Sequence, residues 1–191
     1  MTASFRTGRL SLRLVRQTDR QHLVALECDP EVMRFLSCGR PISHDGADES
    51  AGFLTPRGTE GDVWTAAETL SGAFVGWFSL RRVRKGMAEL GYRLRRDAWD
   101  RGYASEGARG LVGRGFAEVG LERIVAKTMA VNHASRRVLE KAGLAHVRTV
   151  YPHWRDPIPG SELGDVEYEI TRDVWQTTSG RSCAGATPAW L

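Results

Sequence analysis

Residues 91–144 contain three short segments in order: GYRL (91–94), WDRGYASE (99–106) and NHASRRVLEKAGL (132–144). In the middle segment, Gly102 can adopt backbone angles that are closed to other residues. The small Ala104 lets successive backbone N–H groups approach an anion at the start of a helix from Ser105. The segment therefore predicts an anion-binding turn between a strand and a helix, although a plain glycine-containing turn is the alternative when it is taken alone.

The periodicity of apolar residues predicts the elements around these segments. Alternation over residues 10–14 is typical of a strand with one buried face. Helical spacing follows over residues 18–27, and Asp29-Pro30 opens a second helix that reaches Phe35. Further helices are predicted over residues 44–54, 105–119 and 134–142, and further strands over 63–68, 73–80, 87–94, 124–130, 146–150 and 165–171.

The order of these elements predicts a mixed α/β fold. Antiparallel strands precede a strand–helix–strand–helix unit. Among them, the strands at 63–68 and 73–80 are joined as a hairpin through TLSG (69–72). We expect one domain over residues 1–176. A last short turn starts at Asp173, and residues 177–191, which are rich in Ser, Gly, Thr and Ala, are expected to form a weakly ordered tail.

Composition excludes several classes of protein. The chain has 191 residues, of which 41% are hydrophobic and 26% charged, as expected for one globular domain. No apolar stretch approaches the roughly 20 residues that span a bilayer, so we expect a cytoplasmic protein without a membrane partner. The three cysteines and five histidines lack zinc-site spacing, which predicts free thiols and no metal. A net charge of +4, without basic and aromatic residues interleaved, is mild for a nucleic-acid binder.

At these spacings, the three segments resemble the coenzyme-binding core of the GCN5-related N-acetyltransferase (GNAT) superfamily. Trp99, the opening RLSLR (9–13) and the closing EYEI (167–170) are similar to its ribosomal-protein-alanine N-acetyltransferase-like (RimJ/RimL-type) branch. The resemblance covers the chain to about residue 176. It implies an acyl-CoA N-acyltransferase fold: a mostly antiparallel sheet of about six to seven strands, with splayed central strands and flanking helices.

The resemblance also implies an activity. The enzyme would move an acetyl group from acetyl-CoA to a primary amine by direct attack on the thioester. The acceptor would be a protein N-terminal α-amine or a small-molecule amine, and the enzyme a monomer or homodimer. Many members carry a tyrosine at the place of Leu139, where it protonates the departing thiolate. Its absence leaves open a catalytically weak acetyl-CoA-binding sensor or interaction domain.

Residues that bind the coenzyme are implied by position. In the family, the backbone of the turn binds the pyrophosphate, and the end of the preceding strand, residues 92–95 here, pairs with the pantetheine arm. Asn132 can contact that arm and also start a helix, and Arg136 can meet the phosphates or simply be solvated. The implied coenzyme-binding residues are Leu94, Arg95, Arg101, Gly102, Tyr103, Ala104, Ser105, Asn132 and Arg136, with the backbone amide near Leu94 as oxyanion donor.

Two residues are candidates for the chemistry. Glu89 is the first choice for the base that receives the amine proton, because its strand should border both acyl group and acceptor. The alternative interpretation of Glu89 is an outward-facing strand residue in a salt bridge. Ser135 resembles a serine that the branch places near the coenzyme sulfur, where its hydroxyl can donate to the leaving thiolate; the alternative is a serine of the first helical turn. We interpret Glu106 as a structural residue at the helix start and give His133 no chemical role.

The acceptor site is expected between the two N-terminal helices and the loop of residues 151–164. This loop contains three prolines and can be a rigid specificity element or idle surface. The candidate lining residues are Tyr151, His153, Trp154 and Glu162.

Overall fold

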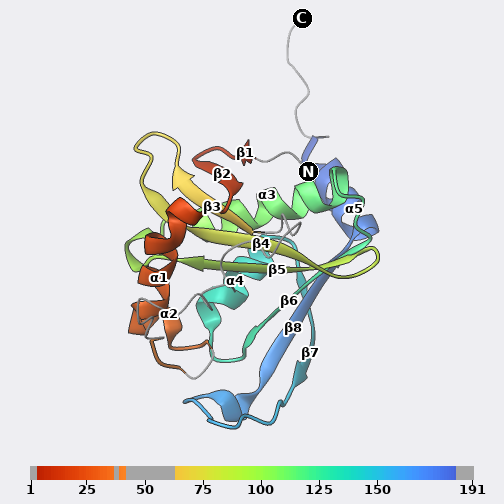
Figure 1. The fold of residues 1–191 in the computed structure, drawn as a ribbon. Coiled ribbons are helices and arrows are strands. Elements are labelled where there is room, and N and C mark those ends of the chain that lie inside the picture. The colour runs from red at the N-terminus through yellow and green to blue at the C-terminus, as the bar shows by residue number, and fades with distance from the viewer. Residues whose placement is uncertain (1–3, 37–38, 42–62, 184–191) are drawn as a thin grey trace, which may run out of the picture.

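The computed structural model describes residues 4–36, 39–41 and 63–183, with side chains described up to residue 178. These residues form one eight-stranded sheet with the order β1-β2-β3-β4-β5-β6-β8-β7 (Figure 1). Its strands are β1 Ser4–Arg6, β2 Leu10–Leu14, β3 Val63–Glu68, β4 Phe74–Arg84, β5 Met87–Leu94, β6 Arg123–Met129, β7 Ala145–Val150 and β8 Asp165–Thr171. The helices are α1 Arg20–Cys28, α2 Pro30–Met33, α3 Tyr103–Ala117, α4 His133–Lys141 and α5 Arg172–Cys183.

The sheet is antiparallel except at its centre. There β5 and β6 run parallel, and they pair over three positions only, from Met87↔Arg123 to Glu89↔Val125. Beyond that point β6, β8 and β7 turn away from β5 as a separate ribbon (Figure 1). The second half of β5 is therefore paired with β4 on one edge and, among the described residues, has no strand along the other edge.

Helices cover both faces of the central strand β4. Phe78 is fully buried on the face covered by α3, where Gly107 lies directly over its ring. On the opposite face, Trp77 packs in a second apolar cluster with Leu23 and Leu26 of α1. Because successive strand residues point to opposite faces, β4 contributes to both layers of the core.

The predicted fold class is confirmed, and four strands, at 10–14, 63–68, 87–94 and 165–171, have the predicted bounds. Other described elements are shifted from the prediction by one to four residues at their ends, and two differences are larger. The short edge strand β1 raises the number of strands to eight, because three residues are too few for alternation to show. The expected last turn is the twelve-residue helix α5, which extends into the predicted tail and packs Trp175 on Phe116 at 5.4 Å between ring centroids. The predicted helix over 44–54 lies outside the described residues.

Replacing Gly107 by Ala tests how closely α3 lies on the sheet. A Cβ at this position would lie 2.3 Å from Phe78 Cζ, so we expect the free energy of unfolding to fall by about 1–3 kcal/mol through overpacking. In the same helix, a Cβ at Gly113 meets nothing within 4 Å. There the same substitution should stabilise the protein by about 0.5–1 kcal/mol through helix propensity. Urea unfolding measures the free energy of unfolding of both variants. Equal effects at the two positions would contradict the close packing of α3 on Phe78.

Candidate active site

The open edge of β5 exposes backbone groups in the middle of the sheet. The N–H of Arg95 donates to the carbonyl of Val75 at 3.1 Å, so alternation turns the backbone groups of Tyr92 and Leu94 away from β4. The carbonyl of Leu94 accepts from Trp99 Nε1 at 2.9 Å. The N–H of Leu94 and both backbone groups of Tyr92 face the side from which β6 has departed. An extended amide-containing chain can pair with such an edge.

The turn before α3 presents further N–H groups. Gly102 has φ 79° and immediately precedes the helix, and no side chain in the described ranges caps this end. The first backbone bond of the helix runs from Glu106 N to the carbonyl of Gly102 at 3.1 Å. The N–H groups of Tyr103, Ala104 and Ser105 thus belong to the first turn, where a helix supplies no acceptors and the helix dipole favours an anion. This geometry fits a pyrophosphate.

Glu106 anchors this turn to the N-terminal strands. Its carboxylate accepts from Thr7 Oγ1 at 2.6 Å and from Arg9 N and Nε at 2.6 and 2.7 Å. Burial alone would raise the pKa of Glu106, but the hydrogen bonds from Thr7 and Arg9 outweigh it and hold that pKa below its usual value. Arg9 also donates to the carbonyl of Arg101 at 2.9 Å. The structure supports the structural interpretation of Glu106 and adds Arg9, which the sequence analysis did not single out.

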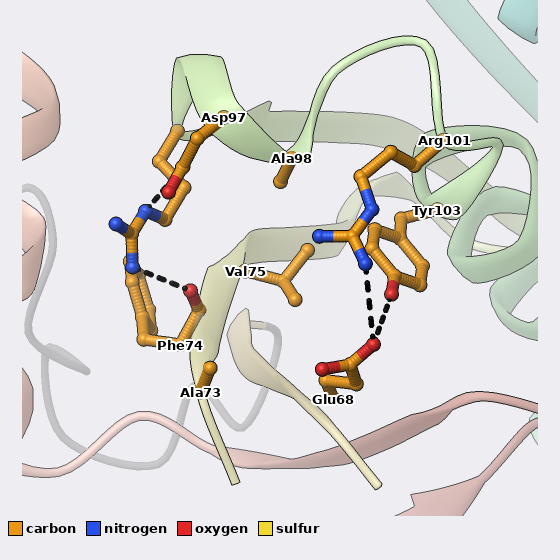
Figure 2. A pocket seen from close by; sticks show the side chains of 9 residues that line it. Glu68, Ala73, Phe74, Val75, Asp97, Ala98, Arg101 and Tyr103 are labelled. Atoms are coloured by element: carbon orange, nitrogen blue, oxygen red, sulfur yellow. Dashed lines mark hydrogen bonds and ion pairs between the residues drawn. The ribbon is translucent and has the colours of Figure 1, made fainter. Parts of the chain in front are cut away.

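The side chains of three predicted coenzyme-binding residues already have protein partners. Figure 2 shows Arg101 and Tyr103 directed at Glu68. Arg95 forms an ion pair with Asp97 and donates to the carbonyl of Phe74. The hydrogen bond to Glu68 raises the pKa of Tyr103. The cavity that these side chains line measures about 40 Å³, too small for a coenzyme. Any contribution to phosphate binding from Tyr103 would therefore come from its backbone N–H.

The start of α4 is fixed by a second set of contacts. Asn132 Oδ1 accepts from Ser135 N at 3.1 Å, which confirms the helix-starting role. Arg136 donates from Nη1 to the carbonyl of Ala130 at 3.1 Å and from Nε to the hydroxyl of Tyr168 at 3.2 Å. Arg136 therefore ties α4 to the end of β6 and to β8. Contacts of Asn132 and Arg136 with a coenzyme stay predictions.

Ser135 lies against Tyr92, whose side chain was given no role in the sequence analysis. The hydroxyl oxygen of Tyr92 is 2.9 Å from Ser135 Oγ and 3.1 Å from the Ser135 carbonyl oxygen, to which it can donate. Leu139, one turn further along α4, is buried in the core. The GYRL segment contained Tyr92, but only the fold brings its ring to α4.

Glu89 and Ser135 border the split between β5 and β6 from different sides. Glu89 is the last residue of β5 that pairs with β6, and its side chain alternates to the face opposite Tyr92. Its carboxylate forms an ion pair of 2.7 Å with Arg81, its cross-strand neighbour on β4. Glu89 is therefore a salt-bridged strand residue, as the alternative interpretation expected. About a third of its side chain remains exposed.

A buried ion pair joins α1 to β5 on that same face. Arg93 Nη1 lies 3.0 Å from Glu27 Oε1, and the two side chains are 9% and 6% exposed. The guanidinium carbon of Arg93 lies 5.5 Å from the ring centroid of Trp77. Burial lowers the pKa of Arg93, and the charge of Glu27 opposes that effect. The sequence analysis missed this pair because its members are 66 residues apart.

The loop between β7 and β8 is held beside the site. Ile158 packs against Gly39, just beyond α2, and Gly160 packs against Val131, which precedes Asn132. A groove of about 480 Å³ follows this loop. Its lining residues are Pro152, His153, Trp154, Pro157, Ile158, Pro159, Ser161 and Glu162. Three of the four candidate acceptor residues line the groove, whereas Tyr151 is 74% exposed and does not.

Comparison with known proteins identifies the family. Residues 9–145, which carry the open edge, the Gly102 turn and α4, match the family model described as an acetyltransferase (GNAT) domain. The chain belongs to the GNAT acetyltransferase family. It is therefore an N-acetyltransferase, and acetyl-CoA is the cosubstrate that the family implies.

Individual relatives agree with this assignment. The chain is 37% identical over 179 residues to the FsC-acetyl coenzyme A-N(2)-transacetylase of Aspergillus fumigatus, covering 88% of this chain and 76% of that protein. A GNAT acetyltransferase from Bacillus anthracis has the same fold, with a TM-score of 0.73, 21% identity and coverage of 89% and 99%. A spermidine N-acetyltransferase from Vibrio cholerae, solved with CoA and spermine, gives a TM-score of 0.72 at 15% identity, covering 87% and 97%.

The described residues contain neither a membrane-spanning helix nor a cluster of metal ligands. In residues 4–36, 39–41 and 63–183, no helix is both long and apolar enough to cross a membrane. Within the same ranges, no three side chains of His, Cys, Asp or Glu gather as a metal ion would require.

Replacing Glu106 by Gln tests the anchor of the Gly102 turn. We expect a loss of about 1–3 kcal/mol in unfolding free energy at pH 7, because charge-assisted hydrogen bonds are weakened. The folded-state pKa of Glu106 is lowered, so its contribution is complete above the unfolded value of about 4.3 and disappears as pH falls through the folded value. The difference between variant and wild type should therefore shrink below about pH 4.

Glu118→Gln is the matched control for this experiment. Glu118 lies just after the same helix and pairs with Arg114 at 2.8 Å, but its side chain is 47% exposed. Glu118→Gln should lower the free energy of unfolding by less than about 0.5 kcal/mol. A pH-independent effect of Glu106→Gln would show that the carboxylate charge does not hold the turn.

Proposed function

We propose that this enzyme acetylates a primary amine on the α-carbon of an amino-acid unit, in a small molecule or at a polypeptide N-terminus. The observation that carries the reaction is the juxtaposition of the open β5 edge with the uncapped N-terminus of α3 at Gly102. The relative at 37% identity is named for transfer to an N(2) nitrogen, which in amino-acid nomenclature is the nitrogen on the α-carbon. The RimJ/RimL-type segments favour the same class of amine.

The first step of the proposal is binding of acetyl-CoA. The N–H groups of Tyr103, Ala104 and Ser105 would hold the pyrophosphate, with Gly102 providing the bend. The free backbone groups of Tyr92 would pair with the amide groups of the pantetheine arm. The N–H of Leu94 would then donate to the oxygen that becomes negative during attack. Arg95, Arg101, Asn132 and Arg136 would contribute secondary contacts around this path.

The second step is attack by the neutral amine. Glu89 would receive the proton, directly or through a water, from its place where β5 and β6 separate. Ser135 would donate a hydrogen bond to the departing thiolate. The amine would arrive between α1, α2 and the β7–β8 loop, whose groove presents His153, Trp154 and Glu162.

The reaction is tested by thiol release from acetyl-CoA with a panel of free amino acids, short peptides, lysine side-chain analogues and polyamines. We expect turnover to be fastest with α-amines, and calorimetry should show acetyl-CoA binding without an acceptor. Binding without turnover of any amine would support the sensor alternative. Absence of binding would contradict the assignment of the Gly102 turn.

Gly102→Ala locates the coenzyme within the same assay. Gly102 has φ 79°, which strains an alanine, and an added Cβ would lie 3.2 Å from Arg9 Nη2. The N–H groups of the turn should therefore be displaced. We expect the Kd of acetyl-CoA to rise at least about tenfold, equivalent to one lost charge-assisted hydrogen bond. Gly120→Ala is the control, because Gly120 has φ 76° and open space around it, so backbone strain is matched away from the site. An equal effect of both would indicate general destabilisation.

Glu89→Gln tests the base. We expect kcat to fall by about 10²–10⁴, the usual contribution of a general base, with the Kd of acetyl-CoA unchanged. Glu167→Gln is closely matched, because Glu167 on β8 also forms a 2.7 Å ion pair, with Arg148, and is 32% exposed against 35% for Glu89. Unchanged kcat in Glu89→Gln would assign the proton to another acceptor.

A further inference from the structure

The hydroxyl of Tyr92 and the hydroxyl of Ser135 lie side by side at the split in the sheet. Their oxygens are 2.9 Å apart, and the Tyr92 oxygen is also 3.1 Å from the carbonyl oxygen of Ser135. A phenol has one proton to donate, so it can serve the carbonyl or Ser135 Oγ, but not both at full strength. The pair therefore has two arrangements of its protons that require only rotation of O–H bonds.

In the first arrangement, Tyr92 donates to the Ser135 carbonyl and the Ser135 proton points at Tyr92. In the second, Tyr92 donates to Ser135 Oγ, and the Ser135 proton is released toward a third group. Ser135 is half-buried, so such a group can reach it, whereas the Tyr92 ring packs against Phe78 at 6.2 Å between centroids. The side chain that can turn outward is therefore Ser135, and the side chain that holds it is Tyr92.

Building on the proposed function, we propose that Tyr92 is a positioning residue that acts through Ser135, so that two hydroxyls in series stabilise the leaving thiolate. When the C–S bond breaks, its electron pair stays on sulfur. Ser135 O–H donates a hydrogen bond to that sulfur, and Tyr92 O–H turns from the carbonyl to Ser135 Oγ. No proton leaves either side chain; the thiolate takes its proton from solvent, which balances the proton lost by the amine.

Tyr92 is suited to this role by its surroundings. Burial raises its pKa well above the usual value, with the nearby Tyr168 adding to the effect, so the phenol stays neutral and keeps its proton. Leu139 has no hydroxyl and lies buried one turn after Ser135 on α4. The hydroxyls near the predicted position of the leaving sulfur are thus those of Tyr92 on β5 and Ser135 in the first turn of α4.

The position of Tyr92 also couples these two hydroxyls in series, called the relay below, to the open edge of β5. Its backbone groups lie on the free edge of β5, while its side chain reaches α4. Displacement of that edge would move the Tyr92 ring, and the orientation of the Ser135 hydroxyl would follow. Tyr92 therefore serves the predicted pantetheine path with its backbone and the predicted sulfur position with its side chain.

A double-mutant cycle tests the proposal with the full chain. Tyr92→Phe removes the phenol oxygen and keeps the ring. We expect it to lower kcat 10- to 100-fold while KM for acetyl-CoA stays within threefold, because the hydrogen bond is needed only as the thiolate forms. Ser135→Ala should lower kcat at least as much. The double variant should match Ser135→Ala alone, since Tyr92 has no route to the sulfur without Ser135.

Tyr168→Phe is the control for loss of a buried phenol on the same side of the sheet. The Tyr168 hydroxyl donates to Glu140 at 2.9 Å and accepts from Arg136, and no described bond joins it to Ser135. Because Tyr168 also holds Arg136, its loss can itself lower activity, so the control is read as coupling: we expect the effects of Tyr168→Phe and Ser135→Ala on kcat to multiply in the double variant, whereas Tyr92→Phe adds nothing to Ser135→Ala.

The outcomes separate the relay from the proposed function. Independent, multiplying effects of Tyr92→Phe and Ser135→Ala would overturn the relay while leaving the reaction intact. Full activity of Tyr92→Phe would do the same. Full activity of Ser135→Ala would remove the assignment of Ser135 and the relay with it. A wild-type protein that acetylates no amine in the panel would overturn both.

Discussion

The structure depends on a parallel ladder that stops after three residue pairs. Backbone N–H and C=O groups in the middle of a sheet need partners. In the part of the chain that the structure describes, loss of the ladder beyond Glu89 leaves the groups on this edge of β5 without a neighbouring strand. A chain that contains amides can supply the missing partners. The departure of β6 therefore creates, within an otherwise closed core, an edge that favours a ligand of the pantetheine type.

The two sides of this opening are held by different contacts. On the α3 side, Glu106 binds Arg9 and Thr7, so that the Gly102 turn is fixed to the first strands. On the β6 side, Arg136 binds the Ala130 carbonyl and Tyr168 and thereby fixes the start of α4. A preorganised opening loses less conformational entropy on binding than one that must be ordered by the ligand. These polar contacts are therefore part of how the site binds, even where they touch no ligand.

The parts of the site that the sequence predicted are those set by neighbours along the chain. A positive φ at Gly102 and a cap at Asn132 depend on a few consecutive residues, so a single segment reveals them. Glu106, which binds Arg9, lies 97 residues away, and only tertiary packing pairs the two residues. The expectation of about six to seven strands missed β1, because three residues are too few for alternation to show. A turn was expected in place of α5, because this helix contains Thr, Ser and Gly, which favour other conformations.

Three consecutive residues of β5 connect the layers that meet at the site. The side chain of Tyr92 reaches α4, the side chain of Arg93 reaches Glu27 of α1, and the N–H of Leu94 faces the opening. A buried ion pair is costly to break on one side only, because the remaining charge would be left without compensation. The position of α1, which borders the expected acceptor path, is thereby tied to the strand that lines the coenzyme path. Since neighbouring side chains of a strand point to opposite faces, this one segment fixes both paths relative to each other without any loop between them.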